Sequence, residues 1–321
     1  MQRRTYILLP LVALLIACEK EITVDLPITE QSVVVEGNIE NGQPPFVLLS
    51  RTQSYFAPTS TASLADVFIT DGVVTVFDGV TTHTLSMICS GELSEEELQI
   101  AAEATGISID LLRSVNICAW TVLDGSLVGE VGRTYQLNVQ ADGKTLTSTT
   151  TIPPIVALDS LWFRLALRDA DDDSLGFIWA RLSDPSDANN QYRWAAQRLN
   201  LGSDGEPKDD SFIAPLFSVF EDRYINGLSF DFNYNRGSQA YSEAEDDNNE
   251  EAGFFKRGDT VAVKFSSIDR NVFKFYDSYA NNVASAGDLF SNPANVKSNI
   301  TGGLGVWAGY AASFDTVICV P

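Results

Sequence analysis

Two Asp-Gly dipeptides, each placed between β-prone runs, restrict most strongly how this chain can fold. Val73–Phe77 is followed by Asp78-Gly79, and an alternating run that begins at Tyr135 is followed by Asp142-Gly143 and a threonine-rich run. An Asp-Gly pair between two such runs is a strong signal for a β-hairpin. Strands at this spacing predict a mostly β protein in which residues 32–153 form an Ig-like antiparallel β-sandwich.

A small helical insert is expected within this sandwich, at residues 93–116. Ser94 and Glu97 have the spacing of a capping box, and Gly106 is suited to the end of a helix. The insert is either a binding protrusion or a decorated loop, and the sequence favours the loop.

Pro153-Pro154 marks the predicted start of a second β-rich domain, residues 154–321. Proline lacks a backbone N–H, so it is excluded from the middle of a sheet. One amphipathic helix is expected in this second domain, beginning after Asp269. Its apolar face would be formed by Val272, Tyr276, Tyr279 and Val283, at helical spacing.

Residues 1–17 have the composition of a signal peptide. Two arginines precede an apolar run that is too short to span a bilayer, and a small residue precedes Cys18. A cysteine at this place resembles the lipobox of bacterial lipoproteins, in which the thiol is acylated. We therefore expect lipidation at Cys18, a lipidated tether over residues 18–31, and a protein anchored to a membrane by its lipid.

The three remaining cysteines would lie in an oxidising compartment if the chain is exported. Cys89 and Cys118 bracket the helical insert, so a disulfide between them is favoured, with stabilisation of about 3 kcal/mol from loop closure. Cys319 would remain as a buried thiol near a C-terminal strand. No Cys-x-x-Cys pair occurs, so a zinc or thioredoxin-like site is not indicated.

Acidic residues outnumber basic ones by 43 to 21, which gives a formal net charge of −22. Nucleic-acid binding requires a basic surface, so this charge argues against it. The simpler interpretation is a solvated surface that keeps an exported protein soluble. The alternative is a surface that collects cations or a basic partner.

The acidic segment Asp169, Asp171 and Asp173 is a weak candidate for a Ca²⁺ site. Its carboxylates stand at alternate positions, as in a calcium loop, but Ser174 and Ala180 occupy the places of the required glycine and glutamate. A solvated hairpin loop is the favoured interpretation, and no metal or other cofactor is expected.

No catalytic residue is indicated, and the chain is expected not to be an enzyme. His83 is the single histidine, and no nucleophile motif accompanies it. If a ligand site exists, the aromatic residues of the second half are weak candidates, namely Trp194, Phe232 and Tyr234. Aromatic side chains in such a region are more often part of a hydrophobic core.

Four sets of segments, in order along the chain, carry a resemblance to a known family. They are residues 33–37 with 47–51, residues 132–139 with 150–153, residues 184–185 with 192–193, and residues 292–294 with 298–300 and 303–307. Together they resemble the Bacteroidetes outer-membrane lipoproteins catalogued as domain of unknown function 4249. The helical insert is outside this resemblance.

The resemblance implies a cellular location and a protein partner rather than a catalytic activity. The family has no established catalytic residues, and its members are often encoded beside TonB-dependent transporters. We therefore expect a non-catalytic accessory or ligand-capture partner of such a transporter, anchored at the cell outer membrane. Glu19 and Glu21 partly resemble a surface-export signal, which favours the cell surface over the periplasm. The alternative is a structural or adhesive envelope lipoprotein without a small ligand.

Overall fold

The computed structural model describes residues 31–53, 65–166, 174–202, 205, 207–237, 251, 253–285 and 295–320. Residues 31–321 belong to one compact unit. The described chain is mostly β-structure, arranged as three sheets with a few helices, which confirms the predicted class.

The largest sheet has eight strands and supplies one layer to both halves of the fold. Its strands, in spatial order, are β12 (Val219–Glu221), β11 (Gln191–Arg198), β15 (Thr260–Ile268), β16 (Leu304–Ile318), β1 (Val33–Glu40), β2 (Phe46–Arg51), β6 (Cys118–Thr121) and β5 (Ser86–Cys89).

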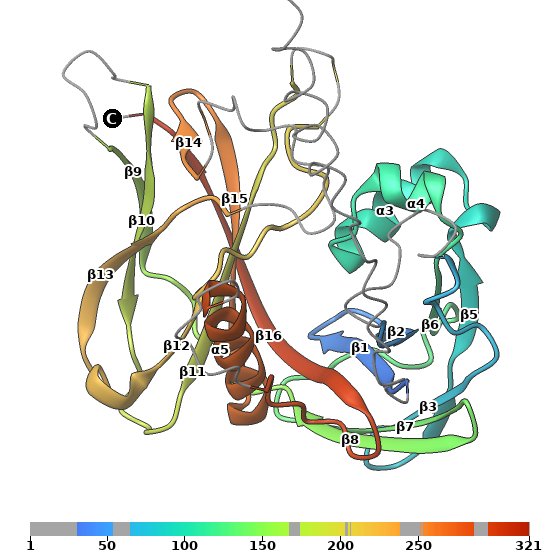
Figure 1. Ribbon diagram of the computed structural model, residues 1–321. Coiled ribbons are helices and arrows are strands. Elements are labelled where there is room, and N and C mark those ends of the chain that lie inside the picture. The colour runs from blue at the N-terminus through green and yellow to red at the C-terminus, as the bar shows by residue number, and fades with distance from the viewer. Residues whose placement is uncertain are drawn as a thin grey trace, which may run out of the picture. The chain divides into compact units, whose positions relative to one another are not determined.

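Two four-stranded sheets provide the opposing layers. The first consists of β4 (Thr82–Thr84), β3 (Val73–Phe77), β7 (Thr134–Ala141) and β8 (Lys144–Thr151). The second consists of β9 (Ser160–Leu165), β10 (Leu175–Ser183), β13 (Ser229–Tyr234) and β14 (Phe255–Lys256). Figure 1 shows β16 passing from the side of β9, β10 and β13 to the side of β3, β7 and β8.

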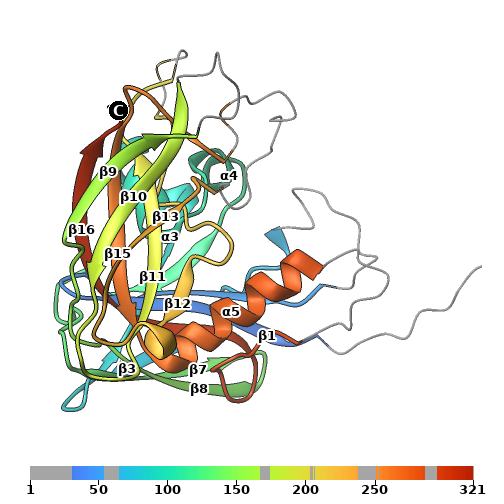
Figure 2. The same ribbon diagram turned by 90° about the vertical axis from the view of Figure 1, so that its left-hand side faces the viewer.

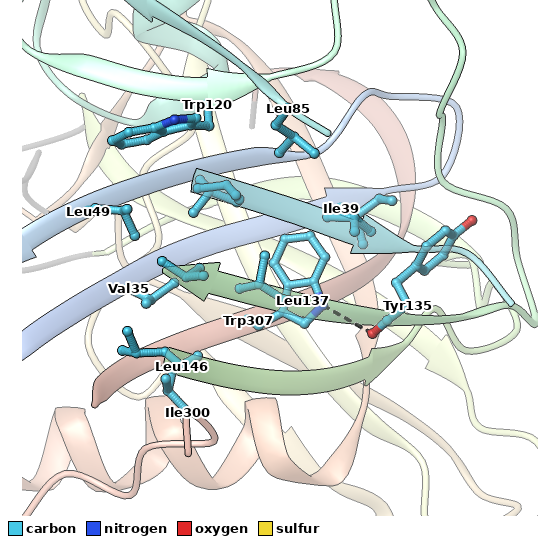
Figure 3. Close-up of a cluster of buried hydrophobic side chains, with 14 of the residues drawn as sticks. Val35, Ile39, Leu49, Leu85, Trp120, Tyr135, Leu137, Leu146, Ile300 and Trp307 are labelled. Atoms are coloured by element: carbon cyan, nitrogen blue, oxygen red, sulfur yellow. Dashed lines mark hydrogen bonds between the residues drawn. The ribbon is translucent and has the colours of Figure 1, made fainter. Parts of the chain in front are cut away.

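Strand β16 contributes to the cores on both sides. Trp307 and Ala311 are buried in the first hydrophobic cluster, with residues of β1, β2, β3, β7 and β8. Val317 packs against the second cluster, which β10, β11 and β15 dominate. In Figure 3 the Trp307 indole lies among Val35, Leu137 and Leu146, and its Nε1 donates a hydrogen bond to the Tyr135 carbonyl at 3.2 Å.

The predicted two-domain boundary falls between β8 and β9. Most residues of the first cluster precede it, and the residues of the second cluster follow it. However, Ile300 and Trp307, from the C-terminal side, are buried in the first cluster. Residues 32–153 therefore do not complete their core without β16, and the eight-stranded sheet is continuous across the boundary.

One strand pair departs from the expected antiparallel arrangement. Strand β1 pairs with β16 in parallel, with Val34 opposite Leu304 and Glu40 opposite Tyr310. Parallel neighbours cannot be joined by a tight turn, and here they come from opposite ends of the chain. Gly37 lies opposite Trp307, and a Cβ there would meet the indole at 2.9 Å, so glycine is required by this close approach.

Both predicted hairpins are present. In the β7–β8 hairpin, Ala141 pairs with Lys144, which leaves Asp142 and Gly143 as the turn. Both turn residues have positive φ (49° and 70°), as the tight turns favoured by Asp-Gly require. In the β3–β4 hairpin, the Asp78 carboxylate accepts hydrogen bonds from the backbone N–H groups of Val80 and Thr81.

The predicted insert contains helices α3 (Glu95–Thr105) and α4 (Ile109–Ser114), after the 3₁₀ turn η1 (Ser90–Glu92). The capping box at Ser94 is present, and Gly106 ends α3 in the left-handed conformation. The helices bury Leu98 and Leu112 against Leu48 of β2. Cys89 and Cys118 form a disulfide between β5 and β6 at the base of the insert.

Helix α5 (Arg270–Ser285) is the predicted amphipathic helix, and it directly follows β15. A second 3₁₀ turn, η2 (Asp222–Tyr224), lies earlier in the chain, directly after β12. Val272 is buried and Tyr276 packs in the same cluster, but Tyr279 and Val283 are exposed, and Ala280 is buried instead. The reason is a second contact: the Lys297 backbone N–H donates to Ser278 Oγ, so the loop before β16 covers that side of α5.

None of the helices in the described residues has the length and apolar character that crossing a bilayer would require.

We expect Trp307→Ala to lower the free energy of unfolding by about 3–5 kcal/mol, because it removes a fully buried indole from the first core. Urea denaturation would measure this loss. Leu123→Ala, at an exposed position, is the control and should change stability by less than about 0.5 kcal/mol. Equal effects of the two substitutions would contradict the assigned core.

Candidate functional site

A hollow with a volume of about 790 Å³ lies on the outer face of the β3–β4–β7–β8 sheet. This volume is within the range of small-molecule sites. We call it the polar hollow. Its lining residues are Thr75, Phe77, Thr82, Gln136, Leu137, Asn138, Thr147, Ser148, Thr149, Asn271, Lys274, Lys297, Ser298, Asn299, Ile300 and Thr301.

The floor of the polar hollow follows from strand alternation. Successive side chains of a strand point to opposite faces, so Leu137 and Leu146 enter the core while their neighbours face outward. The outward set on β7 and β8 includes Gln136, Thr147 and Thr149, and all three are exposed. The threonine-rich run of the sequence thus provides hydroxyl groups rather than apolar surface.

Helix α5 forms one wall, and Asp269 fixes where that helix begins. Asp269 Oδ1 accepts hydrogen bonds from the backbone N–H groups of Asn271 (2.8 Å) and Val272 (3.0 Å), as an N-cap does. Asp269 Oδ2 accepts a hydrogen bond from Thr150 Oγ1 of β8 at 2.6 Å. Figure 2 shows α5 beside the β7–β8 hairpin. The same carboxylate therefore caps the helix and attaches it to the floor.

Thr150 extends this attachment into the core. Its hydroxyl donates to Asp269 and accepts a hydrogen bond from the backbone N–H of Gly309 in β16, at 2.8 Å. Thr150 is 1 % exposed, so both hydrogen bonds are shielded from water. The start of α5 is consequently held by the strand that both cores share.

The loop before β16 forms the other wall. Asn299 donates to the Trp307 carbonyl and accepts from the Trp307 N–H, at 2.8 and 2.9 Å. Ser148 Oγ donates to the Asn299 carbonyl at 2.8 Å, and the backbones of Thr147 and Thr301 exchange two hydrogen bonds. Because the loop is paired with both β8 and β16, this wall is held in one position.

Arg193 of β11 holds α5 against the eight-stranded sheet. Its guanidinium lies over the Tyr276 ring, 4.0 Å from the centroid, and Nη1 donates to Tyr310 Oη at 3.1 Å. The Tyr276 and Tyr310 hydroxyls are 2.6 Å apart. Burial raises the pKa of Tyr310, so this hydroxyl stays neutral. A cation over an aromatic ring contributes about 0.5–2 kcal/mol, more when water is excluded.

The charge of the polar hollow differs from that of the chain. Its lining includes two ionised side chains, Lys274 and Lys297, and no aspartate, glutamate, histidine or cysteine. Among the described residues, neither lysine ammonium has an ion-pair partner. The lining therefore offers hydrogen-bond donors, acceptors and two cations, but no carboxylate or imidazole for proton transfer.

The structure places the three aromatic candidates together, away from the polar hollow. The ring centroids of Trp194 and Phe232 are 5.9 Å apart, and those of Trp194 and Tyr234 are 5.7 Å apart. Trp194 is fully buried in the second cluster, and Phe232 and Tyr234 pack against it. Trp194 lies on β11 of the eight-stranded sheet, and Phe232 and Tyr234 lie on β13 of the sheet that packs against it. All three side chains point between these two sheets, so they are part of the second hydrophobic core.

Other predicted positions are distributed elsewhere. Cys18 and the Ca²⁺ candidates Asp169, Asp171 and Asp173 lie outside the described residues. Cys319 is a buried free thiol, and burial raises its pKa to about 12, so it stays protonated. Within the described part of the chain, no three His, Cys, Asp or Glu residues are grouped as metal ligands.

Sequence reasoning did not find the polar hollow, although one signal was present. The run from Lys144 to Thr151 contains a polar residue at every outward position and several at inward ones. The inward Ser148 and Thr150 are buried, and their hydroxyls donate hydrogen bonds to the loop wall and to the start of α5, respectively. A strand that is polar on both faces indicates that something polar packs against it.

We expect Asp269→Ala to lower the free energy of unfolding by about 2 kcal/mol, because it removes the helix cap and leaves the Thr150 hydroxyl without an acceptor. Asp269→Asn is the matched comparison: its single amide oxygen can cap the helix, but the NH2 group that replaces Oδ2 cannot accept from Thr150, so its loss should be smaller, about 1 kcal/mol. Urea denaturation measures the stability, and hydrogen exchange of α5 amides locates the change. An Asp269→Asn variant as stable as the wild type would argue against the attachment.

Comparison with known proteins gives one relationship. A family model described as a domain of unknown function, DUF4249, matches residues 19–314, which include both walls and the floor of the polar hollow. No curated protein and no solved structure matches the chain. The matched span covers most of the sequence, and therefore the chain belongs to the DUF4249 family.

Proposed function

We propose that this chain is a non-catalytic, lipid-anchored protein of the outer membrane that captures a polar ligand in the polar hollow and serves a TonB-dependent transporter. The observation that supports capture is the polar hollow itself, a space of about 790 Å³ lined by hydroxyl, amide and ammonium groups. The anchor is inferred from Cys18 and the segment before it. The transporter is inferred from the resemblance to the family, by analogy.

Rigid walls favour binding as the role of the polar hollow. The capped start of α5 and the loop at Asn299 are both hydrogen-bonded to buried strands. A site that is already ordered before binding avoids the entropic cost of ordering it around the ligand. The lining lacks a carboxylate, an imidazole and a thiol, which leaves the two lysines as the lining groups that could transfer a proton.

The structural or adhesive alternative has one observation in its favour. Phe77 is the single aromatic residue among the described residues that line the polar hollow. Binding sites for small molecules usually contain more apolar and aromatic surface. An adhesive protein would use the threonine-rich face as a contact surface for a macromolecule, and no small molecule would then bind in the polar hollow.

We expect Thr149→Trp to abolish ligand binding, because an indole at this outward position would occupy the polar hollow. A panel of monosaccharides, disaccharides, dipeptides and inorganic anions would be screened by thermal shift. A ligand at about 100 times its Kd should stabilise the wild type by about 2.7 kcal/mol. The control is Thr145→Trp, on the same face of β8 but outside the lining. A ligand that stabilises both variants equally would bind elsewhere.

We expect the tagged, lipidated protein to co-purify with a TonB-dependent β-barrel after mild detergent extraction. Mass spectrometry of the purified material would identify the partner and its stoichiometry. A Cys18→Ser variant serves as a control for anchoring, because it removes the predicted acylation site. Recovery of the wild-type protein alone would contradict the transporter role and favour the free-standing envelope alternative.

A further inference from the structure

We propose that the ligand of the polar hollow is a small polyhydroxylated anion, such as a sugar acid or a sugar phosphate, whose negative group is bound by Lys274 and Lys297. This inference rests on the proposed capture function and names its ligand class. It follows from the placement of the two lysines, from the composition of the floor and from the size of the polar hollow.

Lys274 lies on the α5 wall and Lys297 on the loop wall, and a hydrogen bond joins the two walls near both residues. Lys274 and Ser278 are four residues apart on α5, so they lie on the same face of the helix, one turn apart. Ser278 Oγ accepts a hydrogen bond from the Lys297 backbone N–H at 2.8 Å. The backbone of Lys297 is therefore attached one turn from Lys274, and both side chains line the same space.

Two cations that line the same hollow favour a negative group there. Like charges repel each other in inverse proportion to their separation. The chain has 43 acidic side chains, yet no described carboxylate pairs with Lys274 or Lys297, and none lines the polar hollow. A bound anion would relieve this repulsion and form charge-assisted hydrogen bonds with both ammonium groups.

The floor is composed to bind hydroxyl groups. Thr82, Gln136, Thr147, Thr149 and Asn271 line the polar hollow, and their side chains make no hydrogen bond to any other described residue. Hydroxyls and amides both donate and accept, as the hydroxyls of a sugar do. Phe77 adds one aromatic ring, which suits a single apolar face of such a ligand.

The volume of the polar hollow favours a ligand larger than a bare inorganic anion. A space of about 790 Å³ is suited to a molecule of one or two sugar rings, whereas phosphate alone would leave most of the floor groups without partners. Groups that remain unpaired on binding lose the hydrogen bonds they made to water, which opposes the binding of a ligand that is too small.

Titration calorimetry of the mature chain would test the ligand class. The probes are glucuronic acid, which carries a carboxylate, and glucose 6-phosphate, which carries a phosphate. Glucose is the control without charge, and inorganic phosphate is the control without a sugar. We expect at least one acidic sugar to bind at least tenfold more tightly than glucose and than phosphate. Failure of both acidic sugars to bind with a Kd of about 1 mM or tighter would overturn the ligand class.

Substitutions of the two lysines test whether they, rather than the other lining residues, determine the affinity for the acidic sugar. The double variant Lys274→Ala/Lys297→Ala should weaken the acidic sugar at least tenfold, and Lys274→Arg/Lys297→Arg should restore most of that loss. Lys144→Ala is the matched control, because it lies at the far end of β8, outside the lining, and should change affinity less than twofold. Both lysines are exposed, so the double variant should unfold at the same temperature as the wild type.

Thr149→Trp distinguishes failure of this inference from failure of the capture function. If glucose binds as tightly as its acidic derivatives, and Thr149→Trp blocks it while the double alanine variant does not, capture stands and the anionic class is wrong. If an acidic sugar binds equally to Thr149→Trp and to the wild type, the polar hollow is not the site and both proposals fail. Loss of binding in both variants, with Lys144→Ala unaffected, supports the anion site.

Discussion

The sharing of one strand by two hydrophobic cores is the constraint on which the rest of the structure depends. Along β16, Trp307 enters the first core, Tyr310 faces α5 on the opposite side of the sheet, and Val317 packs in the second core. Because side chains alternate, a slip of one residue would remove Trp307 from its core and direct it toward α5. The register of β16 with β1 and β15 therefore fixes both halves and the helix together.

The same strand also determines the geometry of the polar hollow. Gly309 donates to Thr150, Thr150 donates to Asp269, and Asp269 caps α5. Trp307 bonds through its backbone to Asn299, which holds the opposite wall. The groups that would touch a ligand are thus positioned by groups that are buried and cannot move independently. This arrangement explains why an open, polar site can be ordered without a ligand.

The parts of the fold that could be predicted are those in which a few neighbouring residues decide the outcome. Asp142-Gly143 specifies its turn by backbone conformation, and Ser94 with Glu97 specifies a helix start. The parallel pairing of β1 with β16 has no local signal, because the partners come from opposite ends of the chain. The polar hollow could not be predicted for the same reason. It requires the β3–β4 hairpin, the β7–β8 hairpin and residues 271–301 to meet, and none of these segments alone resembles a site.

The net charge of the chain indicates an acidic surface, but it does not indicate the charge of the polar hollow, whose lining has two lysines and no acidic residue. A formal charge of −22 opposes the approach of any anion from a distance, but at physiological ionic strength charges more than about 8 Å away are largely screened. A bound ligand would be in contact with Lys274 and Lys297, where screening by salt is least effective. On the proposed capture function, the acidic surface would act at a distance, whereas the two lysines would act on a ligand in contact with them. Selectivity for an anion in an acidic protein follows from this difference in distance.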